Sequence, residues 1–156
     1  MDKKELWRLL DQNLWTTSQV ARFFECAAST IRLHVQQLTA ARSLQTVDFH
    51  GKNKIHLSLI HISDLSLLRP ESVPASRRLP RATIAKKQLT KLLERETMTL
   101  EEVCEEAGVS QALVWQRVAA AARRGESIGY AFEGGRLRIY HRSELTLFGR
   151  KYARRG

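Results

Sequence analysis

The amino-acid sequence contains an internal repeat in which matched residues are 83 positions apart. Val20 in the stretch TTSQVAR matches Val103 in TLEEVCE, 83 positions later. The same spacing relates an upstream series: Lys4, Leu6, Leu9, Leu10 and Asp11 fall on Lys87, Leu89, Leu92, Leu93 and Glu94. Self-similarity over this length predicts two copies of one small folded unit, each with its own core.

Each copy opens with the amphipathic segment just described and continues with the start of a second helix. Thr16 and Gln19 in the first copy match Thr99 and Glu102 in the second. In each pair the Thr side chain can accept from an early backbone N–H while the side chain three places on reaches back, as in a capping box. The two stretches therefore predict two equivalent helix starts.

A third helix and a hairpin follow in both copies. Apolar residues at i, i+4 and i+7 mark one buried helix face: Ile31, Val35 and Leu38, and then Val114, Val118 and Ala121. Next, apolar residues at alternate positions flank a Gly-containing turn, a pattern typical of a β-hairpin. They are Val47, Phe49, Ile55, Leu57 and Leu59, and then Ile128, Tyr130, Phe132, Leu137 and Ile139. Matching Leu137 to Ile55 lowers the spacing to 82, so we expect the second hairpin to be one residue shorter.

Helix, helix, turn, helix and hairpin thus occur twice, which predicts a mainly α-helical chain with small β-hairpins, an α+β fold of two tandem domains. We expect the domains over 1–62 and 84–143. Between them, 63–83 holds all three prolines and is predicted to be an extended, basic linker that reaches about 70 Å. Residues 144–156 end with four cations in seven residues and are predicted to form a basic carboxy-terminal arm.

Both copies resemble winged helix-turn-helix DNA-binding domains of bacterial regulators, in TTSQVARFFECAASTIRLHVQQL and in TLEEVCEEAGVSQALVWQRV. The matching features are small or β-branched apolar residues in the second and third helices and a turn-opening residue. They are Val20, Ala21 and Ile31 in the first copy and Val103, Ala107, Gly108 and Val114 in the second. The first copy departs at Glu25, where a positive φ would cost roughly 1 kcal/mol. It departs again at Ala27, a poor N-cap in the place of Ser110.

The resemblance implies that both third helices enter the major groove of duplex DNA, where Arg pairs with guanine, Gln with adenine and Ala with thymine methyl groups. Positions outside the buried stripes are Ala28, Ser29, Arg32, Leu33 and Gln36, and then Gln111, Ala112, Trp115 and Gln116. We expect Arg32 and Gln111 to make the most informative base contacts, with phosphate contact as the alternative for Arg32. Trp115 either touches thymine methyls or sugars, or packs within the protein.

Further cations are candidates for DNA contact. The hairpin tips carry Lys52, Lys54, Arg136 and Arg138, the linker carries Arg77, Arg78 and Arg81, and the arm carries Arg150, Lys151, Arg154 and Arg155. These groups either contact phosphates and the minor groove or are ordinary solvated charge.

Charge and motif content narrow the class of function. A formal net charge of +10 and a pI near 10.2 favour a polyanionic partner, nucleic acid before an anionic membrane surface. No apolar run approaches the length of a membrane span, so a cytoplasmic protein is expected. The five histidines have no repeated acid or Cys partner and are expected at the surface, and Cys26 and Cys104 as small apolar core residues. We therefore expect no enzyme, metal or cofactor.

These observations predict a sequence-specific double-stranded DNA-binding protein. One monomer would read about 20 bp, two adjacent turns, with two unlike helices, whereas a dimer would be needed for a palindrome. A bacterial, phage or plasmid transcriptional regulator is the first interpretation. A plasmid transfer-origin or partition accessory protein is an alternative, with polymerase, a relaxase or a partition factor as a second partner. A winged-helix protein-interaction scaffold is another.

Overall fold

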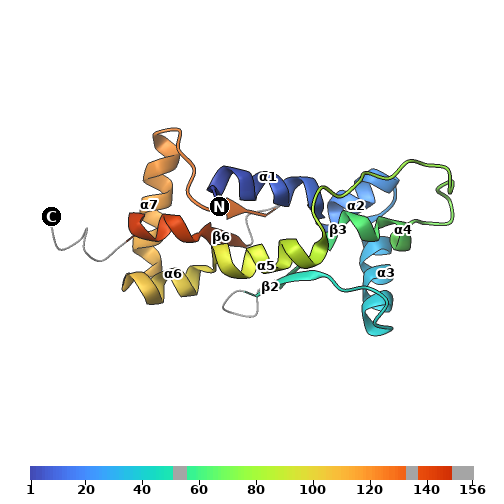
Figure 1. Ribbon diagram of the computed structural model, residues 1–156, viewed down its shortest axis with the longest axis horizontal. Coiled ribbons are helices and arrows are strands. Elements are labelled where there is room, and N and C mark those ends of the chain that lie inside the picture. Colours follow the sequence, from blue (N-terminus) through green and yellow to red (C-terminus); the bar gives the residue numbers. More distant parts are fainter. Residues whose placement is uncertain (51–55, 133–136, 149–156) are drawn as a thin grey trace. The chain divides into compact units, whose positions relative to one another are not determined.

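The computed structural model describes residues 1–50, 56–132 and 137–148 (Figure 1). The chain divides into two compact units. We call residues 4–48 and 58–90 the first unit, and residues 1–3, 49–57 and 91–156 the second unit. Helices predominate, and there are two small three-stranded sheets, so the predicted mainly α, α+β class is confirmed.

The elements of the two sequence copies follow the same order. The first copy contains α1 (Lys3–Asn13), β1 (Leu14–Trp15), α2 (Thr17–Phe24), α3 (Ala28–Ala40), β2 (Val47–His50), β3 (His56–His61), the 3-10 helix η2 (Ile62–Asp64) and α4 (Leu65–Leu68). The second contains α5 (Lys86–Glu96), β4 (Thr97–Met98), α6 (Leu100–Ala107), α7 (Gln111–Arg123), β5 (Tyr130–Ala131), β6 (Arg138–His141) and the 3-10 helix η4 (Arg142–Leu147).

The predicted helix starts at Thr16 and Thr99 are present. Thr16 Oγ1 accepts from the Gln19 backbone N–H at 3.2 Å, and Gln19 Oε1 accepts from the Thr16 N–H at 2.8 Å, which completes the capping box. Thr99 Oγ1 likewise accepts from the Glu102 N–H at 3.3 Å, but the Thr99 hydroxyl donates to the Glu102 carboxylate at 3.3 Å. The second cap therefore uses a side-chain contact in place of the reciprocal backbone bond.

The turns between the second and third helices confirm both expected departures of the first copy. Glu25 has φ 57°, in the left-handed region, where the second copy has Gly108 with φ 68°. Ala27 is the N-cap of α3 and forms no side-chain cap, whereas Ser110 Oγ accepts from the Leu113 N–H at 3.2 Å. The tight turn is therefore built in both copies, and with more backbone strain in the first.

Each sheet contains a strand that the sequence did not predict. β1 pairs antiparallel with β3, with Leu14 opposite His61, and β4 pairs in the same way with β6, with Thr97 opposite His141. β5 pairs with the other edge of β6. The register makes His61 and His141 equivalent, only 80 positions apart. The expected spacing of 82 is therefore wrong, and the second hairpin is three residues shorter than the first.

The repeat also continues beyond the hairpins. HISDLSLL at 61–68 matches HRSELTLF at 141–148, and in both copies a His side chain caps a 3-10 helix. His61 Nδ1 accepts from the Ser63 N–H at 3.3 Å, and His141 Nδ1 accepts from the Ser143 N–H at 3.2 Å. Residues 63–68 and 144–148 of these segments fall in the predicted linker and arm, and the rest fall in the predicted domains.

The extended conformation predicted for the linker is wrong for residues up to Leu68, because Leu65 and Leu68 are buried in a helical turn. Val73 is also buried in the same core, and Leu79 packs against it. In the arm, Phe148 is buried against Tyr140 with ring centroids 5.8 Å apart. Apolar side chains hold both segments on the folded units, so a reach of 70 Å does not apply to 63–83.

The two cores occupy matching places in the repeat. In the first unit, helices α2 and α3 and strand β3 contribute Val20, Ala21, Phe24, Ile31, Val35 and Ile60, together with Leu65, Leu68 and Val73. In the second unit, the core is Met98, Val103, Ala107, Val114, Ala121, Ile128, Tyr140 and Phe148. Cys26 and Cys104 are half-buried at the edges of these cores, and neither is in a disulfide.

Candidate nucleic-acid interface

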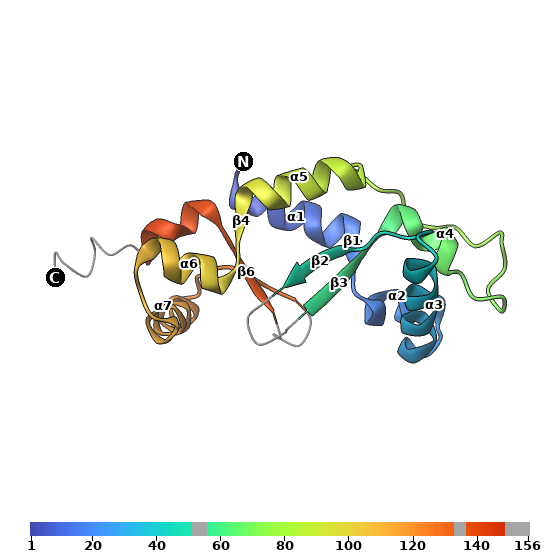
Figure 2. The same ribbon diagram turned by 90° about the horizontal axis from the view of Figure 1, so that it is seen from below.

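The third helix of each copy is anchored on one side and exposed on the other. α3 packs beside α2, and α7 packs beside α6 (Figures 1 and 2). On α3 the buried residues are Ile31 and Val35, and on α7 they are Val114 and Ala121. The buried stripe is therefore narrow, and each helix has an exposed outer face.

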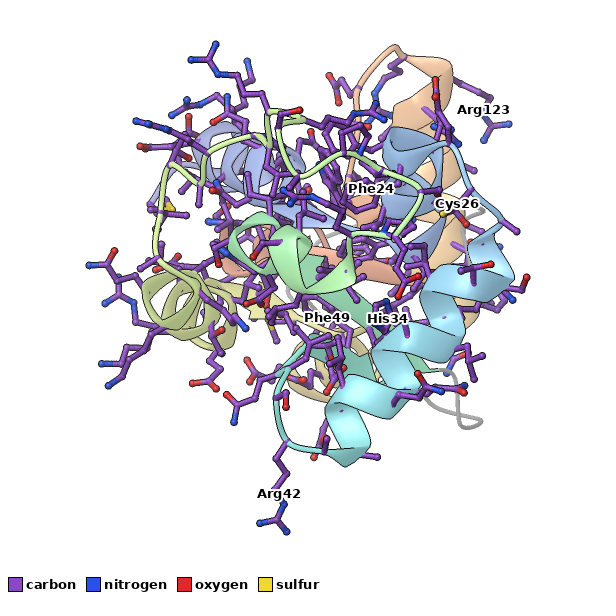
Figure 3. The ribbon with its side chains drawn as sticks, turned by 90° about the vertical axis from the view of Figure 1, so that its right-hand side faces the viewer. Phe24, Cys26, His34, Arg42, Phe49 and Arg123 are labelled. Atoms are coloured by element: carbon purple, nitrogen blue, oxygen red, sulfur yellow. The ribbon has the colours of Figure 1, made fainter. Side chains whose placement is uncertain are left out.

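The outer face of α3 in the first unit combines hydrogen-bonding and apolar groups. Ser29, Arg32 and Gln36 are exposed, and 56% of Leu33 is accessible to solvent. Ala28 is half-buried against the core and contributes less to this face than the sequence suggested. His34 lies on the same helix and is half-buried (Figure 3).

The outer face of α7 in the second unit has a different chemistry. Ala112, Trp115 and Gln116 are exposed, whereas Gln111 is half-buried. Trp115 is 58% exposed, the highest value among the large apolar side chains of the described residues. Trp115 therefore does not pack into the core of its own unit.

The other predicted contact cations fall into three groups. Lys52, Lys54, Arg136, Arg150, Lys151, Arg154 and Arg155 lie outside the described residues. Arg78 and Arg81 are exposed, as a DNA contact requires. Arg77 and Arg138 instead make contacts within the protein. The Arg77 guanidinium lies 4.8 Å from the Phe23 ring centroid, and Arg138 donates to the Ile128 carbonyl at 2.8 Å.

Cations at the carboxyl ends of the third helices were missed. Arg42 follows α3 with φ 60° and projects away from the turn (Figure 3), and Arg123 and Arg124 stand at the matching end of α7. All three are exposed. Their position directly after the apolar stripe could have identified them from the sequence, because cations are favourable at the carboxyl end of a helix.

The two units carry the same formal charge but differ at their second helices. By sequence, the first unit holds eleven Lys or Arg residues against six Asp or Glu, and the second unit holds fifteen against ten, so each has a formal charge of +5. Exposed Glu102, Glu105 and Glu106 on α6 replace Gln19, Arg22 and Phe23 of α2. Electrostatic attraction to a polyanion is therefore stronger at α2 than at α6.

Two histidines proved to be buried and structural, contrary to the expected surface position. His61 is 1% exposed, and its Nε2 bonds to the Ile84 carbonyl at 2.9 Å while Nδ1 accepts from Ser63. These partners fix the neutral tautomer with hydrogen on Nε2, and burial holds the pKa of His61 below its usual 6.5. His141 is 3% exposed, with Nε2 3.5 Å from the Glu96 carboxylate. Each histidine is followed three places later by an acid, a repeated partner that the sequence analysis overlooked.

Short stretches from the start of each copy complete the unit formed mostly by the other copy. In the first unit the Asn13 side chain binds the backbone N–H groups of Thr83 and Ile84, and Lys86 pairs with Asp64. In the second unit Lys3 Nζ donates to Glu144 at 2.9 Å and to the Ser127 carbonyl at 2.9 Å. Residues 84–90 and 1–3 are therefore tied to their units by specific polar contacts.

Comparison with known proteins gave no relative: no protein-family model, curated protein or solved structure matches this chain. Over residues 1–50, 56–132 and 137–148, no cluster of three or more His, Cys, Asp or Glu side chains could hold a metal ion. No helix within the same ranges has the length and apolar character needed to cross a membrane. The interface is therefore interpreted from its own residues.

Proposed function

We propose that this chain is a sequence-specific double-stranded DNA-binding protein that reads its site with two unlike helix-turn-helix units. The observation that carries the proposal is the pair of third helices, each anchored by a narrow buried stripe and each exposing side chains suited to base edges. Arg32 and Gln36 offer donors for guanine and adenine, and Gln116 offers an amide on α7.

The exposed cations of the first unit contribute electrostatic attraction in this proposal. Besides Arg32, the exposed cations of this unit include Arg22, Arg42, Arg78 and Arg81. If these four cations reach phosphates, the logarithm of affinity falls with the logarithm of salt concentration with a slope of about −3.6. Sequence discrimination then depends on a few base contacts of about 1 to 3 kcal/mol each.

We further propose that the protein regulates transcription in the cytoplasm of a bacterium, on a chromosome, phage or plasmid. An accessory role at a plasmid transfer origin or partition site uses the same DNA-binding units and would require a relaxase or partition protein as second partner. Mapping the occupied sites separates the two, because promoters favour regulation and one cluster beside an origin favours the accessory role.

A protein-interaction scaffold is the second candidate, and the exposed acids on α6 favour it. Exposed acids on α6 oppose DNA phosphates, whereas they suit a basic protein surface. In this case the first unit alone would bind DNA, and the footprint would cover about 10 bp instead of about 20 bp.

The experiment compares the wild-type chain with Arg32→Ala on a footprinted duplex and on every single-base variant of it. We expect Arg32→Ala to bind the footprinted duplex about fivefold or more weakly than the wild type. At the base pair that Arg32 contacts, the variant should no longer discriminate between bases, so its affinity there should approach that of the wild type. Thr39→Ala is the matched control on an exposed position of α3, and we expect no change in base preference. A uniform loss over all variants would reject base reading by Arg32 and leave phosphate contact.

A further inference from the structure

The two outer faces differ most at one pair of equivalent positions. Trp115 stands 83 residues after Arg32, on the same exposed position of its helix. Arg32 carries a permanent positive charge and five donors, whereas Trp115 offers a large apolar ring and a single N–H. The two units therefore present different chemistry to whatever they bind.

Trp115 stands clear of its neighbours on α7. Two of its four neighbours on the helix surface, Ala112 and Ala119, are exposed single methyl groups, and the other two, Gln111 and Val118, are half-buried. More than half of the indole surface faces water, at 58%. An apolar partner that covers this ring would gain binding free energy from burial.

The surrounding charge limits how this face can attach to a nucleic acid. Glu102, Glu105 and Glu106 are exposed on the neighbouring α6, and the cations of α7 follow Gln116: Arg117 is half-buried and Arg123 lies in the last turn. Ala112 and Trp115 therefore offer base edges an apolar contact rather than a charged one. The apolar group that a major groove presents is the 5-methyl of thymine.

We propose that α7 reads thymine by apolar contact: the Trp115 indole, with Ala112 beside it, packs against thymine 5-methyl groups in the half-site of the second unit. Arg32 on α3 is the polar counterpart in the other half-site. Trp115 is then a specificity-determining residue, and the bound DNA is thymine-rich on one side. The inference rests on the proposed DNA-binding function and adds which base and which chemical group the second unit recognises.

The test replaces thymine by deoxyuracil, which removes the methyl group and keeps every hydrogen-bonding atom. The wild-type chain is titrated against its selected duplex with thymines of one half-site exchanged at a time. In one half-site, each contacted thymine that is replaced by deoxyuracil is expected to weaken binding about fourfold, the factor for burying one carbon group. Trp115→Ala is expected to bind the thymine and uracil duplexes equally, and more weakly than wild type binds the thymine duplex.

Two measurements keep the result specific. Trp115→Ala should unfold at the wild-type temperature, because the side chain is mostly exposed, and should leave the salt slope unchanged. Ala122→Ser, at an exposed α7 position that is not among the proposed contacts, should keep both the affinity and the thymine preference.

The outcomes separate this inference from the proposed function. Wild-type binding to duplex DNA with no uracil effect in either half-site, or a thymine preference that survives Trp115→Ala, overturns the inference alone. Unchanged DNA affinity in Trp115→Ala overturns it as well. A wild-type chain that binds no duplex at low salt overturns the proposed function together with the inference.

Discussion

Asn13 holds the start of the second sequence copy in the first unit, and its removal should destabilise that unit. The Asn13 side chain is fully buried and makes four hydrogen bonds. Nδ2 donates to the Leu9 carbonyl and to Thr83 Oγ1, each at 2.8 Å. Oδ1 accepts from the backbone N–H groups of Thr83 at 2.8 Å and Ile84 at 3.3 Å. Substitution of Asn13 by Ala removes all four hydrogen bonds at once.

The magnitude follows from the exposure of the partners. Four bonds at about 1 kcal/mol each set an upper value of about 4 kcal/mol. Thr83 is exposed and Ile84 is half-buried, so water replaces some of the lost partners. We therefore expect Asn13→Ala to lower the free energy of unfolding by about 2 to 3 kcal/mol, measured by urea denaturation.

Two further variants sharpen the measurement. Thr83→Val removes the hydroxyl acceptor but keeps both backbone bonds, so about 1 kcal/mol is expected. Gln12→Ala changes the exposed neighbour on the same helix and should cost less than about 0.5 kcal/mol. If Asn13→Ala were no more destabilising than Gln12→Ala, the hydrogen-bond network would not hold residues 83–90 in this unit.

Three other perturbations test the strain, the titration and the charge of the units. Glu25→Gly should raise the free energy of unfolding by about 0.5 kcal/mol in urea melts, because Gly adopts φ 57° without steric cost; a lower midpoint would contradict the strain. Because the folded-state pKa of His61 lies below 6.5, the unfolded state takes up a proton first, and stability should fall as pH drops below 6.5 until folded His61 titrates. Urea melts at pH 7.5 and 5.5 should show a smaller change for His61→Asn, and an equal change would contradict this assignment. Glu105→Arg, which copies Arg22 of the first unit, should tighten binding to duplex DNA and steepen the salt slope by about 1; unchanged binding would place α6 away from phosphates.

Local signals predicted the helices and turns well. The capping residues Thr16 and Thr99 and the apolar stripes on the third helices act within a few positions of the chain, so their spacing is sufficient. Glu25 was expected to be strained because the repeat aligns it with Gly108. The internal repeat thus supplied information that one copy alone could not.

Features that depend on tertiary contacts were not predictable in the same way. The two-residue strands β1 and β4 are too short for a periodic pattern and exist because β3 and β6 pair with them. The three prolines of 63–83 suggested an extended chain. Leu65 and Leu68 are nevertheless helical, because they pack on the core. Arg138 was predicted to contact DNA, but it donates to a carbonyl ten residues away in sequence. That partner is brought close only by the fold, so it could not be predicted.

Selection of bound duplexes from a random pool tests the central claim most directly. The wild-type chain, Arg32→Ala and Trp115→Ala are each used to select DNA at low salt, and the enriched sequences are compared. The expected wild-type site has two blocks of sequence information, one of which is relaxed by Arg32→Ala and the other, thymine-containing, by Trp115→Ala. Wild-type sequences no different from the starting pool would contradict the account.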